Sequence, residues 1–112
     1  MVRRCHALRS KPIDEFTIED LRLMIGQQIG LRHLVPIALQ YLRDDPLAEG
    51  DYYPGDLLAA ILRVDGDFWQ QKPDLNRELR NMIVALTHDR TIDIDPAVQE
   101  LIAEFTRRDH LT

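Results

Sequence analysis

Carboxylates and aromatic side chains are concentrated in one stretch of this 112-residue chain, and these are the residue types best suited to chemistry or binding. From Asp44 to Asp67 there are seven carboxylates and one cation, Arg63, so this segment carries −6 while the whole chain carries −5. Such a segment can offer oxygen ligands to a metal ion or attract a basic partner. The candidates in it and directly after it are Asp44, Asp45, Glu49, Asp51, Tyr52, Tyr53, Asp56, Asp65, Asp67, Phe68 and Trp69.

Metal chemistry does not fit the spacing of these residues. A calcium loop beginning at Asp65 would need an oxygen ligand at its fifth position and glycine at its sixth, but Trp69 and Gln70 stand there. Its twelfth position is Asn76 where a glutamate is required. The four histidines are scattered, with no pair at helical ligand spacing: His6, His33, His88 and His110. We therefore expect no metal site and no cofactor.

Nucleophilic catalysis is disfavoured as well. The one cysteine, Cys5, and the one serine, Ser10, both lie near the start of the chain, and no glycine-flanked serine occurs. Gly26 and Gly30 do not form a phosphate-binding loop. The sequence predicts a protein that is not an enzyme.

The acidic segment has two interpretations. In the first, its carboxylates and exposed aromatic side chains form a docking surface, since complementary charge speeds encounter and aromatic residues anchor an interface. In the second, Asp51 caps the following helix, Asp56 lies near the positive end of the helix dipole, and Tyr52 and Tyr53 pack inward. The structural interpretation explains Asp51 and Asp56 about as well as docking does. It explains less well four other carboxylates of the segment, Asp45, Glu49, Asp65 and Asp67.

The elements that must position these residues show helical periodicity almost throughout. A first helix is expected from Thr17, with Asp20 completing a capping box, Gly26 weakening the helix and Gly30 ending it. A second spans about residues 31–43 and either kinks at Pro36 or begins near it. A third follows the acidic loop and carries Leu57, Leu58, Ile61 and Leu62.

The second half of the chain predicts two more helices. Residues 65–67 indicate a turn and Phe68–Trp69 a short one, after which Pro73 opens a strongly amphipathic helix. Residues 91–94 alternate in polarity and are expected to form an extended connector. Asp95 and Pro96 then predict an N-cap and a first helical residue. The fold class is therefore all-α, a compact single-domain bundle of about five amphipathic helices.

Composition limits the domain organisation and the partners. We expect residues 1–15 to be a peripheral or poorly ordered segment and residues 16–112 to form a single helical domain. One cysteine permits no internal disulfide, and no long apolar run is present, so a cytoplasmic protein without membrane contact is expected. The negative net charge argues against nucleic-acid binding. A monomer is favoured.

Two stretches resemble a known family. They are FTIEDLRLMIGQQIGLRHLVPIAL, residues 16–39, and DPLAEGDYYPGDLL, residues 45–58, and the likeness continues weakly to Trp69. Both are similar to immunity proteins of contact-dependent growth inhibition. The resemblance implies a protein without catalytic activity that binds the C-terminal toxin domain of a cognate effector and neutralises it.

Such toxins are often nucleases, which need basic surface to hold phosphate. The resemblance and the charge pattern together predict an acidic inhibitor of a basic toxin domain. The predicted toxin-binding residues are Asp44, Asp45, Glu49, Asp51, Tyr52, Tyr53, Asp56, Asp65, Asp67 and Trp69. A helical adaptor or regulatory domain in another complex remains the alternative, since it would have the same composition.

Overall fold

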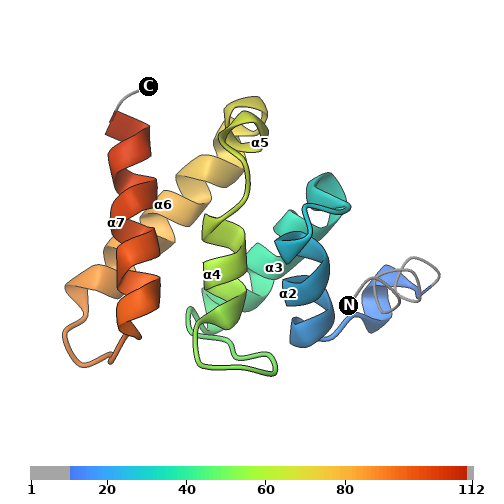
Figure 1. The fold of residues 1–112 in the computed structure, drawn as a ribbon, viewed down its shortest axis with the longest axis horizontal. Helices are drawn as coiled ribbons and strands as arrows, with labels where there is room; N and C mark the ends of the chain where they lie inside the picture. The colour runs from blue at the N-terminus through green and yellow to red at the C-terminus, as the bar shows by residue number, and fades with distance from the viewer. Residues whose placement is uncertain (1–10, 111–112) are drawn as a thin grey trace.

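A computed structural model describes the backbone of residues 11–110 and the side chains of residues 11–108. In this part of the chain a short 3-10 turn, η1 (Ile13–Glu15), is followed by six α-helices. The helices are α2 (Ile18–Gly26), α3 (Leu31–Asp44), α4 (Asp56–Leu62), α5 (Gly66–Gln71), α6 (Pro73–His88) and α7 (Pro96–His110). The predicted all-α fold is confirmed (Figure 1).

Helix α4 is the centre of the bundle. It contacts α2 and α3 on one side and α7 on the other, and all seven of its residues are buried. Its sequence, Asp-Leu-Leu-Ala-Ala-Ile-Leu, is apolar on every face after its first residue, which is typical of a helix surrounded by others. Figure 1 shows α4 standing between α7 and α2, with α3 behind it.

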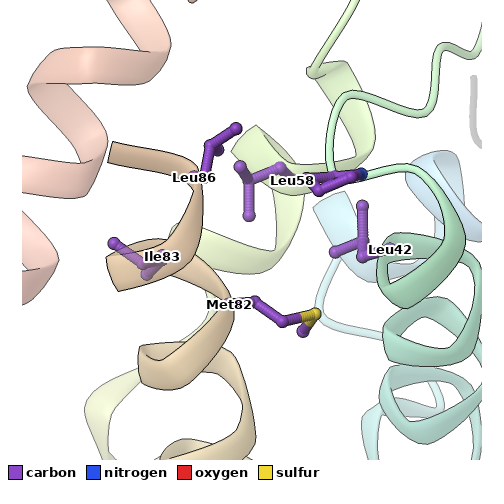
Figure 2. Close-up of a pocket in the computed structure, with 6 residues that line it drawn as sticks. Leu42, Leu58, Met82, Ile83 and Leu86 are labelled. Carbon is purple, nitrogen blue, oxygen red and sulfur yellow. The ribbon is translucent and has the colours of Figure 1, made fainter. Parts of the chain in front are cut away.

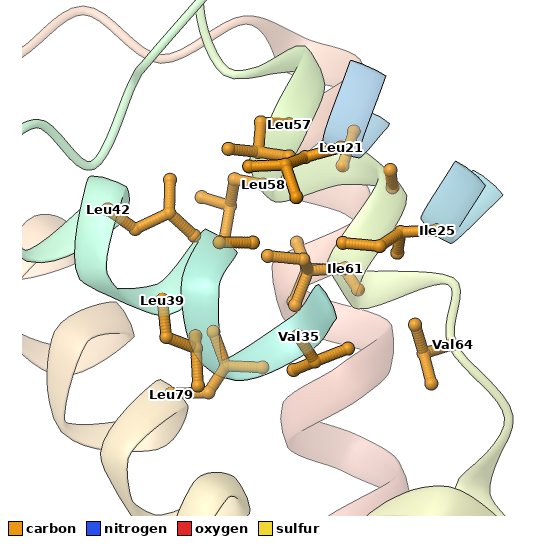
Figure 3. Packing of buried hydrophobic residues seen from close by; sticks show 14 of the residues in the cluster. Leu21, Ile25, Val35, Leu39, Leu42, Leu57, Leu58, Ile61, Val64 and Leu79 are labelled. Atoms are coloured by element: carbon orange, nitrogen blue, oxygen red, sulfur yellow. The ribbon is translucent and has the colours of Figure 1, made fainter. Parts of the chain in front are cut away.

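The core is built from aliphatic side chains of four helices and the link after α4. Figure 3 shows them meeting around α4, with Val64 closing one end of the cluster. Those that are almost completely buried include Leu21, Ile25, Val35, Leu39, Leu42, Leu57, Ile61, Val64 and Leu79. Helix α7 adds Val98 to the same core. Burying these side chains is the main force that holds the helices together.

Several predicted helix boundaries are confirmed. The Thr17 hydroxyl accepts a hydrogen bond from the Asp20 N–H, and the Asp20 carboxylate accepts one from the Thr17 N–H, which completes the capping box. Pro73 is the first residue of α6. Asp95 caps α7, since its carboxylate accepts a hydrogen bond from the Ala97 N–H at 2.9 Å. The connector before it differs from the extended segment expected over residues 91–94, because it begins with a turn in which the Ile92 N–H donates to the Asp89 carbonyl at 3.3 Å.

Other expectations need full or partial correction. Helix α2 ends at Gly26, not at Gly30, which instead precedes α3 with φ of +64°. The expected span of about residues 31–43 is confirmed by α3, which begins at Leu31 and continues through Pro36, so only the alternative start near Pro36 is wrong. Residues 65–69 were expected to form turns, but α5 starts at Gly66 and most of this stretch is helix.

Trp69 explains the last of these differences. Its ring is buried and lies edge-on to Phe105 of α7, with 5.9 Å between ring centroids. A helix of six residues is unstable alone, so tertiary packing, not local sequence, stabilises α5.

The expected division at residue 15 falls partly outside the described residues, which begin at residue 11. Residues 13–15 form η1, and the Lys11 ammonium donates to the Asp20 carboxylate at 2.6 Å. None of the helices within residues 11–110 has the length and apolar content needed to cross a membrane.

Candidate functional site

The acidic segment is divided by the fold into two groups. One group comprises Asp44, the last residue of α3, and Asp45, Glu49 and Asp51 on the loop between α3 and α4. The other, Asp65 and Asp67, lies at the start of α5. Figure 1 places the loop at one end of α4 and α5 at the other end. The charge that is contiguous in sequence is therefore not one continuous patch.

The first group lies on a loop with a defined backbone, which we call the acidic loop, residues 44–53. The Asp45 carboxylate accepts a hydrogen bond from the Leu47 N–H at 3.1 Å, which closes a local turn. Glu49 pairs with Pro54 in a single antiparallel bridge, and the Gly55 N–H donates to the Leu47 carbonyl at 3.1 Å. The side chains of all four carboxylates in this group are exposed.

Asp56 is buried beneath the acidic loop, with 4 % of its surface exposed. One carboxylate oxygen accepts a hydrogen bond from the Gly50 N–H at 2.7 Å. The other accepts from the Tyr52 N–H at 3.1 Å and, more weakly, from the Tyr53 N–H at 3.5 Å. Asp56 therefore fixes the backbone of the loop and has almost no surface to offer a partner.

Two residues of α2 complete the support of the loop. Glu19 is buried, and its carboxylate accepts a hydrogen bond from the Asp51 N–H at 2.9 Å. The same carboxylate accepts two from the Arg22 guanidinium, at 2.6 and 2.5 Å. The Arg22 guanidinium also lies 3.9 Å from the Asp56 carboxylate. We call Glu19, Arg22 and Asp56 the support triad.

Electrostatics favour the charged form of Arg22. The hydrogen bonds from the Arg22 guanidinium to Glu19 raise the pKa of Arg22 above its ordinary value, together with the charges of Glu19 and Asp56, and they outweigh partial burial. Paired charges with shared hydrogen bonds are the form in which buried ions are tolerated. The triad thus joins α2, the loop and α4 into one unit.

The two tyrosines of the loop behave differently. Tyr52 is 65 % exposed, and the Arg22 guanidinium lies 4.5 Å from the centroid of its ring. Tyr53 is half-buried and packs against the core. The inward-packing interpretation therefore applies to Tyr53 and not to Tyr52. Asp51 is not the N-cap of α4, because that position belongs to Gly55 and the helix begins at Asp56.

The second acidic group and Trp69 have structural surroundings of their own. Asp65 occupies the N-cap position of α5, and its N–H donates to the Gln28 side-chain oxygen at 3.3 Å. Asp67 lies in the first turn of α5, where the helix dipole favours negative charge. Trp69 is buried between Phe68 and Phe105 and presents no exposed ring to a partner.

Within residues 11–108, no group of three or more His, Cys, Asp or Glu side chains is arranged to hold a metal ion. Figure 2 shows a gap between α3, α4 and α6 that is lined by apolar side chains, including Leu42, Leu58 and Met82. Its volume is about 10 Å³, which is too small for a ligand.

Comparison with known protein families decides the assignment. Residues 1–79 match the family of CDI immunity proteins, where CDI stands for contact-dependent growth inhibition. The chain belongs to this family. The match includes η1, α2, α3, α4, α5 and the start of α6, so the acidic loop and its whole support triad lie inside the family region. No curated protein matches the chain.

Sequence reasoning missed two residues of this immunity protein's candidate site, Glu19 and Arg22. Their spacing of three on α2 brings both side chains to the same face of the helix. A charged pair on the face that also carries core residues was the available signal. It was not decisive, because acidic residues in a first helical turn are also favoured by the helix dipole.

Proposed function

We propose that this immunity protein neutralises the C-terminal toxin domain of its cognate effector by binding it through the acidic loop. The observation that carries the proposal is the position of Tyr52. Its ring is exposed, stacked on Arg22, and preceded in sequence by the exposed carboxylates Glu49 and Asp51. An aromatic side chain held in place beside exposed charge has the composition of an interface hot spot with a polar rim.

The support triad gives this loop the rigidity that tight binding requires. Because the backbone of residues 50–53 is already hydrogen-bonded to Asp56 and Glu19, little conformational entropy remains to be lost when a partner docks. Glu19, Arg22 and Asp56 are positioning residues in this proposal. The contacts themselves are assigned to Asp44, Asp45, Glu49, Asp51 and Tyr52.

The chemistry of the loop favours a basic toxin surface. We infer that the toxin is a nuclease, since an enzyme that binds nucleic acid must present cations to phosphate. Carboxylates of the loop would occupy those cations and exclude the substrate. The inhibitor would act in the cytoplasm as a monomer, bound to one toxin domain.

Co-expression tests this function directly. The chain is expressed together with the C-terminal domain of the effector encoded beside it, and growth and co-purification are measured. We expect growth to be restored and a stoichiometric complex to be recovered. Continued killing with no complex would overturn the proposal. The recovered toxin, freed of inhibitor, is then incubated with tRNA and DNA, and a toxin that cleaves neither contradicts the nuclease assignment.

A further inference from the structure

A hollow of about 570 Å³ lies between the N-terminal turn and α3. Four of its lining residues share one face of α3, at spacings of three and four, and two more come from η1. We call this hollow the α3 groove. The residues used below are Ile13, Asp14, Ile37, Gln40, Tyr41 and Asp44.

The α3 groove combines apolar walls with an acidic rim. Ile13 is 44 % exposed and Tyr41 is 40 % exposed, which makes them two of the four large hydrophobic side chains exposed within the described residues. Asp14 and Asp44 are exposed as well, and neither forms an ion pair with another described residue. The neighbouring cation of α3, Arg43, pairs instead with Glu78 of α6.

Interface size is the reason to connect this groove with toxin binding. A stable protein complex engages about 20–30 residues and about 800 Å² on each partner. The acidic loop provides only ten residues, 44–53, so a tight complex must extend onto surface next to it. Asp44 ends α3 and belongs to both the loop and the groove, so the two surfaces meet at this residue.

We propose that the α3 groove receives a segment of the toxin domain in which an apolar side chain lies beside a lysine or arginine. The inference rests on the proposed function. The apolar side chain packs between Ile13, Ile37 and Tyr41, and the cation pairs with Asp14 or Asp44. A second copy of this chain is a poor occupant, because each copy carries −5 and the two rims would repel.

Site-specific photo-crosslinking tests the occupant. A benzophenone amino acid replaces Tyr41 in the groove or, as a control, Val84, which is 53 % exposed on α6. With the complex assembled, we expect a crosslink to the toxin from position 41 and none from position 84. A crosslink that stays within the chain, or one that joins two copies of it, would overturn the proposal.

A matched pair of charge substitutions provides an independent measurement. Gln40→Arg places a cation in the groove, and Asn81→Arg places the same side chain at an exposed position of α6. We expect Gln40→Arg to weaken toxin binding at least tenfold while Asn81→Arg binds like wild type. Equal affinities for both variants would exclude the groove but leave the proposed function intact. If wild type itself forms no complex, the function and the groove fail together.

Discussion

The Arg22 guanidinium lies 4.5 Å from the centroid of the Tyr52 ring, while its N–H groups are hydrogen-bonded to Glu19. One side chain of α2 therefore holds an exposed aromatic ring of the loop and a buried carboxylate at the same time. A cation stacked on a ring is attracted by its π electrons, and here the cation cannot move without breaking the pair with Glu19. The exposed ring is thus restricted before any partner arrives.

Replacing Tyr52 by alanine should separate binding from folding. We expect the affinity for the toxin domain to fall at least tenfold, because an anchoring ring is lost, and isothermal titration calorimetry measures this. Tyr52→Phe keeps the ring over Arg22 and should bind nearly as well as wild type. The helical circular dichroism signal should be unchanged in both variants, since the side chain is exposed. Full affinity in Tyr52→Ala would remove Tyr52 from the interface.

Asp56→Asn should destabilise the folded protein. An asparagine offers one acceptor oxygen in place of two, so at least one of the N–H groups of Gly50 and Tyr52 would face a donor. We expect the free energy of unfolding, measured in urea, to fall by about 1–3 kcal/mol. Asp44→Asn, at an exposed position, should change it by no more than about 0.5 kcal/mol. A similar small change in Asp56→Asn would show that these hydrogen bonds contribute little.

Gly50 is required by close packing. A Cβ atom there would lie 2.5 Å from a Glu19 carboxylate oxygen and 3.3 Å from the Glu19 Cα. Glu19 cannot withdraw freely, because its carboxylate holds Arg22 and the Asp51 N–H. We expect Gly50→Ala to lower both thermal stability and toxin affinity.

Gly26→Ala is the matched control, since nothing lies within 4 Å of a Cβ atom at that position, the last residue of α2. It should be neutral or slightly stabilising, because alanine favours helix more than glycine does. If Gly50→Ala and Gly26→Ala had the same thermal stability and the same toxin affinity, this would argue against a packed support beneath the loop.

Lowering the pH should destabilise the N-terminal end of α2, because the Asp20 carboxylate becomes protonated. Burial alone would raise the pKa of this carboxyl, but hydrogen bonds from Lys11 and Thr17 and the Lys11 charge lower it below 3.8. A lowered folded-state pKa adds stability above the unfolded pKa, and this stability disappears as pH falls through the folded pKa. We expect the melting temperature of Asp20→Asn to lie below that of wild type at pH 7, with the difference shrinking below pH 3.8.

Lys11→Met tests the cause of this shift. It removes the ion pair while keeping an apolar stem, so the Asp20 pKa should rise and the acid-induced loss of stability should begin at higher pH. NMR titration of the Asp20 carboxyl measures the pKa in both proteins. An unchanged Asp20 pKa in Lys11→Met would contradict the role given to Lys11.

Two double variants with the same change in net charge identify which end of α4 faces the toxin. Asp45→Asn with Glu49→Gln acts on the acidic loop, and Asp65→Asn with Asp67→Asn acts at α5. Each removes two negative charges from exposed positions. In stopped-flow mixing at low salt, we expect the loop pair to slow association more, and raising the salt to physiological strength should reduce the difference. A larger effect of the α5 pair would move the docking surface to the other end of α4.

Local patterns in the sequence were sufficient for most of the helices. The capping box of Thr17 and Asp20, the Pro73 start and the Asp95 cap all depend on neighbouring residues, and the structure contains each of them. The short helix α5 was not predictable in this way. It depends on contact between Trp69 and Phe105, which lie 36 positions apart in the chain.

By itself, the sequence determined the helical class and the family, and it identified the segment that carries the excess charge. Tertiary structure alone decided what each residue of that segment does. Asp56 lies beneath the loop, Tyr53 and Trp69 pack against the core, Tyr52 remains exposed, and Asp65 and Asp67 lie at the far end of α4. The physical reason is that charge and apolar content are properties of the chain, whereas burial depends on which distant residues the fold brings together. Arg22 reaches Tyr52 only because α2 packs beside α4.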